Sequence, residues 1–201
     1  MLLEGKGKEA ASVLLDPYTP DGKALRRVGD SIVVVTTQRE KLSEASEKAA
    51  STPARLITSP GEYDVREVSI NLFAAERSPM RAAAVITIDG IITVHLGGLA
   101  TAPSESFIEQ FEHVDILTVC VGGEDGMSAS AASNIVRAIE PHVVIPLRYR
   151  TEASAKNYGP LSAFLKEMGA PAVADQEARI KLEADEIRTF EMRVLVLRDQ
   201  S

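Results

Sequence analysis

The chain has 201 residues, of which 45% are hydrophobic and 25% charged, as in an ordinary globular domain. The formal net charge is −7 and no run of Lys or Arg occurs, which argues against nucleic acid and anionic membranes as partners. No apolar run is long enough to span a membrane and no secretory signal is visible, so we expect a cytoplasmic protein. The single Cys120 excludes an internal disulfide and any cysteine-based metal cluster within one chain.

The first part of the chain is predicted to be mainly β. Ser31–Thr36 is a β-branched run typical of a strand buried on both faces. Lys41–Ala50, rich in Glu, Lys and Ala, predicts a helix. Further strands are expected over Ser12–Leu15, Arg55–Thr58 and Tyr63–Phe73, the last as one bent strand or two short ones.

A hairpin is the clearest local feature of the sequence. Ala83–Ile88 and Ile91–His95 are apolar runs separated by Asp89-Gly90, a pair that favours a two-residue hairpin turn.

The second half of the chain alternates strand and helix patterns. Ser104 and Ser128 are plausible N-caps, for a helix ending near Phe111 and a helix ending near Ile139. Pro160 and Gly169 bracket a third helix, which ends near Met168. The remaining segments are predicted strands: Asp115–Val121, His142–Pro146, Ala178–Leu182 and Met192–Leu197.

These patterns indicate one α/β domain over residues 1–201. Strands outnumber helices, and no internal repeat, low-complexity tract or flexible linker divides the chain. Two β-sheets packed together, with helices outside, suit this order of elements.

The residues that could carry chemistry are few. None of the three histidines has a second His within four residues, and His113 with Asp115 makes a His-x-Asp spacing that recurs by chance. We expect a surface or capping role for His113, a structural role for His142 and a core position for Cys120. His95, just before Gly97-Gly98, is either structural or a site residue. Dinucleotide, phosphate-loop and Gly-x-Ser-x-Gly motifs do not occur.

Several short motifs, taken in order, resemble the metallo-β-lactamase-fold superfamily, and within it the small bacterial Zn-dependent-hydrolase-like proteins. Each is weak alone, but their order and spacing cover nearly the whole chain, and the resemblance implies an αββα sandwich of two mixed β-sheets with outer helices. The motifs are Leu2–Gly7, Leu14–Tyr18, Ser59-Pro60-Gly61-Glu62-Tyr63, His95-Leu96-Gly97-Gly98-Leu99, Val121-Gly122-Gly123 and Ile145-Pro146-Leu147-Arg148-Tyr149.

The positions that match the family's metal ligands carry other residues. Thr36 matches the Thr of the family's Thr-His-x-His-x-Asp-His signature, but its four ligand positions fall on Thr37, Arg39, Lys41 and Leu42. The bridging Asp falls on Gly98 and the final His on Arg148, and no His or Cys occurs at 71–75, where another His is expected. The resemblance therefore implies a degenerate member without metal or other cofactor, because guanidinium and ammonium groups have no lone pair to donate.

The replacement cations leave three interpretations open. Arg39, Lys41 and Arg148 neutralise acids such as Asp16, or they bind a phosphate or carboxylate, or they point into water. Asp16 is itself either a turn residue beside Pro17 or a base. The candidate ligand-binding residues of this cleft are Asp16, Arg39, Lys41, His95 and Arg148.

The leading hypothesis is a non-catalytic binding or interaction module. The alternative is a metal-independent hydrolase in which Arg39 and Arg148 orient an anionic substrate and His95 or Asp16 is the base. A third possibility is a subunit that stabilises an active paralogue. The first strand is shorter than the family's and could leave a sheet edge exposed, so we also expect a homodimer.

Overall fold

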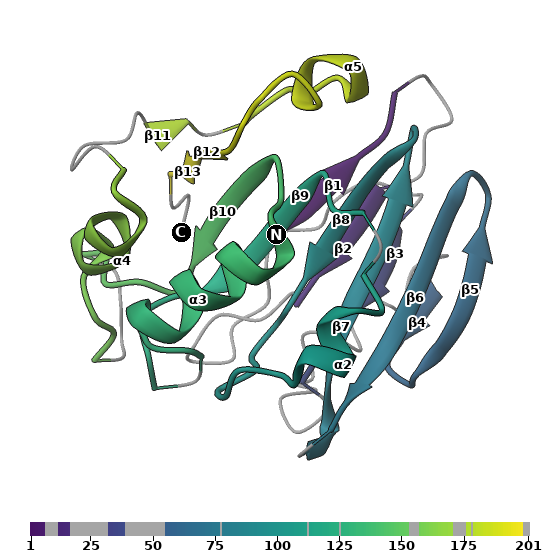
Figure 1. Ribbon diagram of the computed structural model, residues 1–201. Helices are drawn as coiled ribbons and strands as arrows, with labels where there is room; N and C mark the ends of the chain where they lie inside the picture. Colours follow the sequence, from purple (N-terminus) through teal and green to yellow (C-terminus); the bar gives the residue numbers. More distant parts are fainter. Residues whose placement is uncertain are drawn as a thin grey trace.

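The computed structural model describes residues 1–6, 12–16, 32–38, 55–76, 78–111, 113–124, 126–152, 157–170, 176–177 and 179–198. Most of its strands form two sheets (Figure 1). The smaller of the two has the order β1-β2-β3-β4, with β1 antiparallel to β2 and the other neighbours parallel. Its strands are β1 (Leu2–Glu4), β2 (Ser12–Leu15), β3 (Ile32–Val35) and β4 (Arg55–Ile57).

The larger sheet has seven strands in the order β12-β10-β9-β8-β7-β6-β5. Strands β5 to β8 form an antiparallel meander, whereas β8, β9, β10 and β12 are parallel to one another. The strands are β5 (Gly61–Val65), β6 (Val68–Ala75), β7 (Ser78–Ile88), β8 (Ile91–His95), β9 (Ile116–Cys120), β10 (Val143–Leu147) and β12 (Arg193–Val194). Two further short strands, β11 (Gln176–Glu177) and β13 (Val196–Leu197), pair in parallel.

Apolar side chains fill both sides of the large sheet. Between the sheets, Val13, Leu15 and Val35 pack with residues of β6 and β7 such as Ile70 and Ile86. The opposite face of the large sheet carries a second cluster, which the helices cover and which includes Leu117, Val119, Phe107, Ile135 and Phe164. The expected α/β fold, with two mixed sheets and outer helices, is thus the fold of the chain (Figure 1).

The helices begin and end largely where local signals predict. Ser104 caps α2 (Glu105–Ile108), and Ser128 caps α3 (Ala129–Ile139). Helix α4 (Leu161–Met168) follows Pro160 and ends at Gly169, which has a φ of 66°. The Asp89-Gly90 hairpin is also confirmed, with φ values of 50° and 75° that such a turn requires.

Other expectations need correction. Met192–Leu197, predicted as one strand, contains two short strands that pair with different neighbours, whereas Tyr63–Phe73 is divided between two strands, as one of its two predicted alternatives had it. The predicted strand over Ala178–Leu182 is wrong, because residues 179–182 alternate in exposure but are not part of a sheet. Helix α5 (Ala184–Ile187) was not predicted, and its N-cap Glu183 makes no side-chain capping bond that would mark it. The predicted helix over Lys41–Ala50 lies outside the described residues.

None of the helices in the described ranges has the length and apolar character needed to cross a lipid bilayer.

Candidate functional site

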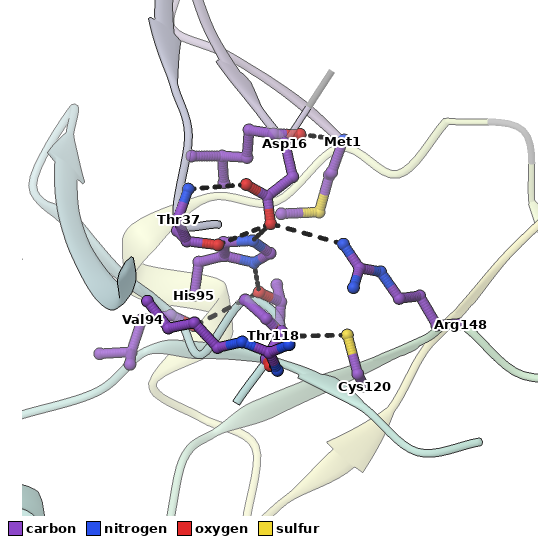
Figure 2. A network of polar contacts seen from close by, with 12 residues as sticks. Met1, Asp16, Thr37, Val94, His95, Thr118, Cys120 and Arg148 are labelled. Carbon is purple, nitrogen blue, oxygen red and sulfur yellow. Dashed lines mark hydrogen bonds and ion pairs between the residues drawn. The ribbon is translucent and has the colours of Figure 1, made fainter. Parts of the chain in front are cut away.

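Polar side chains gather where several parallel strands end. Asp16 follows β2 and Thr37 follows β3, while His95 ends β8 and Arg148 follows β10. Because β2 is parallel to β3, and β8 and β9 are parallel to β10, the carboxyl ends in each sheet meet at one edge. Together with Thr118 of β9, these four residues make a connected set of contacts, which we call the Asp16 network (Figure 2).

Asp16 is the centre of the network. Its Oδ1 accepts a hydrogen bond from the Thr37 backbone nitrogen (2.8 Å), and its Oδ2 accepts one from the Thr37 hydroxyl (2.7 Å). The same Oδ2 lies 3.2 Å from His95 Nε2 and 3.7 Å from an Arg148 Nη2. Only 7% of the Asp16 side chain is exposed, so this carboxylate is held almost entirely by protein groups.

Electrostatics keep the Asp16 carboxylate ionised. Burial alone would raise its pKa, but the hydrogen bond and charge of His95, the charge of Arg148 and the Thr37 hydroxyl together lower the pKa well below its ordinary value. An ionised carboxylate only accepts hydrogen bonds, so His95 Nε2 donates to it.

His95 links the two sheets. Its Nε2 faces Asp16 of the small sheet, and its Nδ1 lies 2.6 Å from Thr118 Oγ1 in the large sheet. The Thr118 hydroxyl also reaches the Val94 carbonyl at 3.5 Å. His95 and Thr118 are both buried, so both ring nitrogens are used inside the protein.

Arg148 and Asp16 share an unusual backbone conformation. Their φ values are 51° and 43°, in the left-handed region that non-glycine residues seldom adopt. Such residues cost on the order of 1–3 kcal/mol each and persist where surrounding contacts over-determine them. The two partners of one ion pair therefore both sit on strained turns.

The space beside Gly97 and Gly98 is filled by the chain itself. A Cβ on Gly97 would lie 2.0 Å from Thr37 Oγ1, and a Cβ on Gly98 would lie 1.2 Å from Gln38 Nε2. Thr37 and Gln38 are fully buried. A side chain at position 98, where the resemblance puts a bridging Asp, would therefore have to displace Gln38.

The structure places three of the five candidate site residues side by side. Asp16, His95 and Arg148, which are far apart in sequence, come together, whereas Arg39 and Lys41 lie outside the described residues. Cys120 is buried as expected, and its Sγ–H donates to the Gly97 carbonyl (3.0 Å).

Sequence reasoning missed Thr37, Gln38 and Thr118 as members or neighbours of the network. Thr118 had a signal, because it is a hydroxyl within the apolar run Ile116–Cys120. Thr37 had one through the resemblance, which puts the first ligand position of the family signature there. Gln38 had none, because nothing in the sequence reveals that it packs on Gly98.

A pocket of about 360 Å³ lies beside the segment that follows β8. Arg81 and Glu76 supply its charged groups, and the Arg81 guanidinium donates to the Gly98 carbonyl at the loop after β8. Its described lining also includes Ala75, Leu99, Ala100, Thr101, Ala102, Pro103 and Phe107. Asp16, His95 and Arg148 are not part of that lining, so the pocket and the network are separate features of the described structure.

The fold and the site together define a class: a two-sheet α/β sandwich whose polar groups meet at the carboxyl ends of its strands. Residues 1–148 match the Beta-lactamase superfamily domain. The chain belongs to the metallo-β-lactamase superfamily.

Similar proteins come from several organisms. A UPF0173 protein of Pyrococcus furiosus is 29% identical in an alignment of 178 residues that covers 77% of this chain and 81% of the relative. A solved structure from Thermotoga maritima, assigned to the Zn-dependent hydrolases of the superfamily, has a TM-score of 0.76 at 24% identity and covers 93% of this chain and 89% of its own. A metallo hydrolase from Ignicoccus hospitalis has a TM-score of 0.52 at 17% identity, over 70% of this chain and 76% of its own. The likeness to these two structures is a likeness of fold.

Proposed function

We propose that this protein is a non-catalytic member of the superfamily, metal-free at the Asp16 network, that uses the fold as a binding or interaction module. The Asp16 network supports this proposal. The Asp16 carboxylate and the His95 imidazole are hydrogen-bonded to each other and to Thr37 and Thr118, and Arg148 lies beside them.

The described residues of this site do not fit a divalent metal centre. Asp16 and His95 are its carboxylate and imidazole, and His95 Nε2 donates toward the carboxylate with a hydrogen, which leaves no lone pair there. The Arg148 cation, 3.7 Å from the Asp16 oxygen, would repel a dication. Gln38, packed on Gly98, fills further space. We infer that internal contacts take the place that metal ligation has in hydrolases of this fold.

The test is metal content together with turnover. Protein made without a His tag, in medium with zinc and manganese, is compared with its His95→Gln variant. We expect equal metal content in the two proteins and no hydrolysis of phosphodiester, lactone or β-lactam substrates with either metal added. Metal-dependent turnover in the wild type that His95→Gln abolishes would contradict the proposal.

A small anion is the ligand class we propose for this module. Arg148 is 18% exposed, and Arg81 is a separate guanidinium that lines the pocket beside the segment after β8. Planar guanidinium groups bind phosphates and carboxylates through paired donors, which a lysine cannot reproduce. Phosphate and citrate titrations of the wild type and Arg148→Lys therefore form a matched pair, and we expect weaker binding in the variant. Equal affinity would remove Arg148 from the ligand site.

A protein partner is the other occupant that this module could have, either a second copy of the chain or a different protein. Sedimentation velocity of the isolated protein separates these cases, because a homodimer has twice the mass of the 21.6 kDa chain.

A second candidate function rests on the order of groups Thr118–His95–Asp16. The Thr118 hydroxyl lies 2.6 Å from the His95 imidazole, which is itself hydrogen-bonded to the Asp16 carboxylate. A nucleophile, a base and an acid that orients the base are arranged in the same spatial order in catalytic triads. This supports a metal-independent hydrolase acting on an anionic substrate. A substrate could reach these groups only after a local opening of the structure, since Thr118 and His95 are 0% and 2% exposed. Ester or phosphoester hydrolysis in the presence of EDTA that Thr118→Val abolishes would favour this function over a binding module.

A further inference from the structure

A second group of potential metal ligands lies at the opposite edge of the large sheet from the Asp16 network. Asp115 directly precedes β9, and His142 directly precedes β10, so both lie at the amino ends of parallel strands. His113 stands in the segment between α2 and β9. One ligand atom from each of the three residues lies within 4.8 Å of the other two.

The spacing is close to what a tetrahedral ion needs. Zinc binds His nitrogen and carboxylate oxygen at about 2.0–2.2 Å, so donor atoms around it lie roughly 3.3–3.5 Å apart. His113 Nε2 is already 3.6 Å from Asp115 Oδ1. The two imidazole rings meet edge to face, with centroids 5.9 Å apart, and a bound ion would draw the three ligand atoms closer than the 4.8 Å within which they now lie.

The proton on His142 has a defined place. His142 Nδ1 lies 2.8 Å from the carbonyl oxygen of Phe190, which can only accept, so Nδ1 carries the hydrogen. The lone pair of the neutral ring is then on Nε2. A backbone carbonyl that fixes the tautomer of a histidine is the usual support behind a metal-ligating imidazole.

Asp115 is fixed and ionised. It is fully buried, and its carboxylate accepts from Ile92 N (2.8 Å) and from Arg188 Nε (3.1 Å) and Nη2 (3.4 Å). Burial opposes its charge, but the Arg188 and Ile92 donors prevail and lower its pKa. A carboxylate has about four lone-pair positions, so one stays available beside His113.

We propose that His113, Asp115 and His142 form a binding site for a divalent transition metal of the zinc type, with water as the fourth ligand. Two imidazoles and one carboxylate are a donor set that zinc accepts, and the half-exposed His113 leaves a path from solvent. The Arg188 cation beside Asp115 opposes the charge of the ion and limits the affinity.

The test is a zinc titration of the full untagged chain against a chromophoric chelator. We expect one zinc per chain, and a loss in affinity of at least about tenfold in His113→Ala and in His142→Ala, since even lost support around a ligand costs that much. Arg188→Gln should bind more tightly, because a repelling charge is removed. Glu109→Gln, an exposed carboxylate of the preceding segment, is the control and should bind as the wild type does.

Three results would overturn the site: no zinc bound, zinc bound equally by His113→Ala, or a Co²⁺-loaded protein without a tetrahedral absorption spectrum. His113 is 55% exposed, so its replacement leaves the fold intact, and an unchanged melting temperature in EDTA verifies this. If zinc binding were lost only in the His95→Gln variant, both this site and the proposed function would be contradicted. Zinc lost only in the His113 and His142 variants supports both.

Discussion

Asp16 combines a buried charge with a left-handed backbone. Its carboxylate faces His95 and Arg148, and its φ is 43°. Asn adopts this backbone region as readily as Asp does, so Asp16→Asn removes the charge without adding strain. The variant therefore isolates the electrostatic part of the network.

We expect Asp16→Asn to lower the free energy of unfolding by about 3–5 kcal/mol, because removing one partner of a buried pair leaves the other charges uncompensated. Urea denaturation at neutral pH measures the change. Asp64→Asn, in the exposed edge strand β5, is the control and should differ from wild type by less than about 0.5 kcal/mol. An Asp16→Asn protein as stable as the control would mean that the network does not stabilise the fold.

Sequence alone could name Asp16, His95 and Arg148 as candidates, but not how they meet. His95 and Asp16 are 79 residues apart in the chain, and their contact depends on the packing of two sheets. The same limit hides Gln38, whose place against Gly98 follows from tertiary packing and leaves no trace in the local sequence.

At the scale of elements, the loop after β9 lies close to the loop after β10 and contains two adjacent glycines with different constraints. A Cβ on Gly122 would lie 2.1 Å from the backbone carbonyl oxygen of Arg148. A Cβ on Gly123 would meet nothing within 4 Å, but the φ of this residue is 72°. Gly122 is therefore limited by space and Gly123 by backbone conformation.

Gly123→Ala should cost about 1–2 kcal/mol, the usual penalty for an L-residue in the left-handed region. Gly122→Ala should cost more, about 3 kcal/mol, since it pushes apart two strand ends in a packed region. Thermal unfolding of both variants shows which substitution destabilises the protein more. If Gly123→Ala were the more damaging, the close approach of the two loops would not exist in solution.

Elements with signals in their own sequence were predictable. Ser104 and Ser128 mark helix starts through their own side chains, and Asp89-Gly90 marks a turn through its own backbone preferences. The short strands near the C-terminal end were not, because β12 and β13 are defined by their separate partners β10 and β11. The alternation at residues 179–182 misled for the same reason: alternation does not supply a neighbouring strand.

At the scale of the whole molecule, two buried carboxylates at opposite edges of the fold make stability depend on pH. The pKa values of Asp16 and Asp115 are both lowered in the folded state, relative to about 3.9 in an unfolded chain. The stability each contributes is fully present above pH 4, and it is lost as the pH falls from there through the folded pKa.

We expect the free energy of unfolding to fall below pH 4, by up to about 1.4 kcal/mol per pH unit for Asp16. The contribution of Asp115 is smaller, because its partner Arg188 is 45% exposed and screened by solvent. Guanidinium denaturation from pH 7 to pH 3 measures this slope. In the double variant Asp16→Asn, Asp115→Asn, the free energy of unfolding should fall less steeply below pH 4 than in the wild type. An unchanged slope would assign the acid sensitivity to other groups.

The order of strands in the large sheet has a consequence for synthesis of the protein. Strand β10 pairs with β9 on one side and with β12 on the other, and β12 follows it in sequence only after α4, β11 and α5. While the ribosome makes those elements, the outer edge of β10 presents unpaired amide and carbonyl groups of an apolar strand. Nascent chains stalled before residue 193 should therefore bind chaperones or aggregate, whereas chains that include β12 can close the sheet.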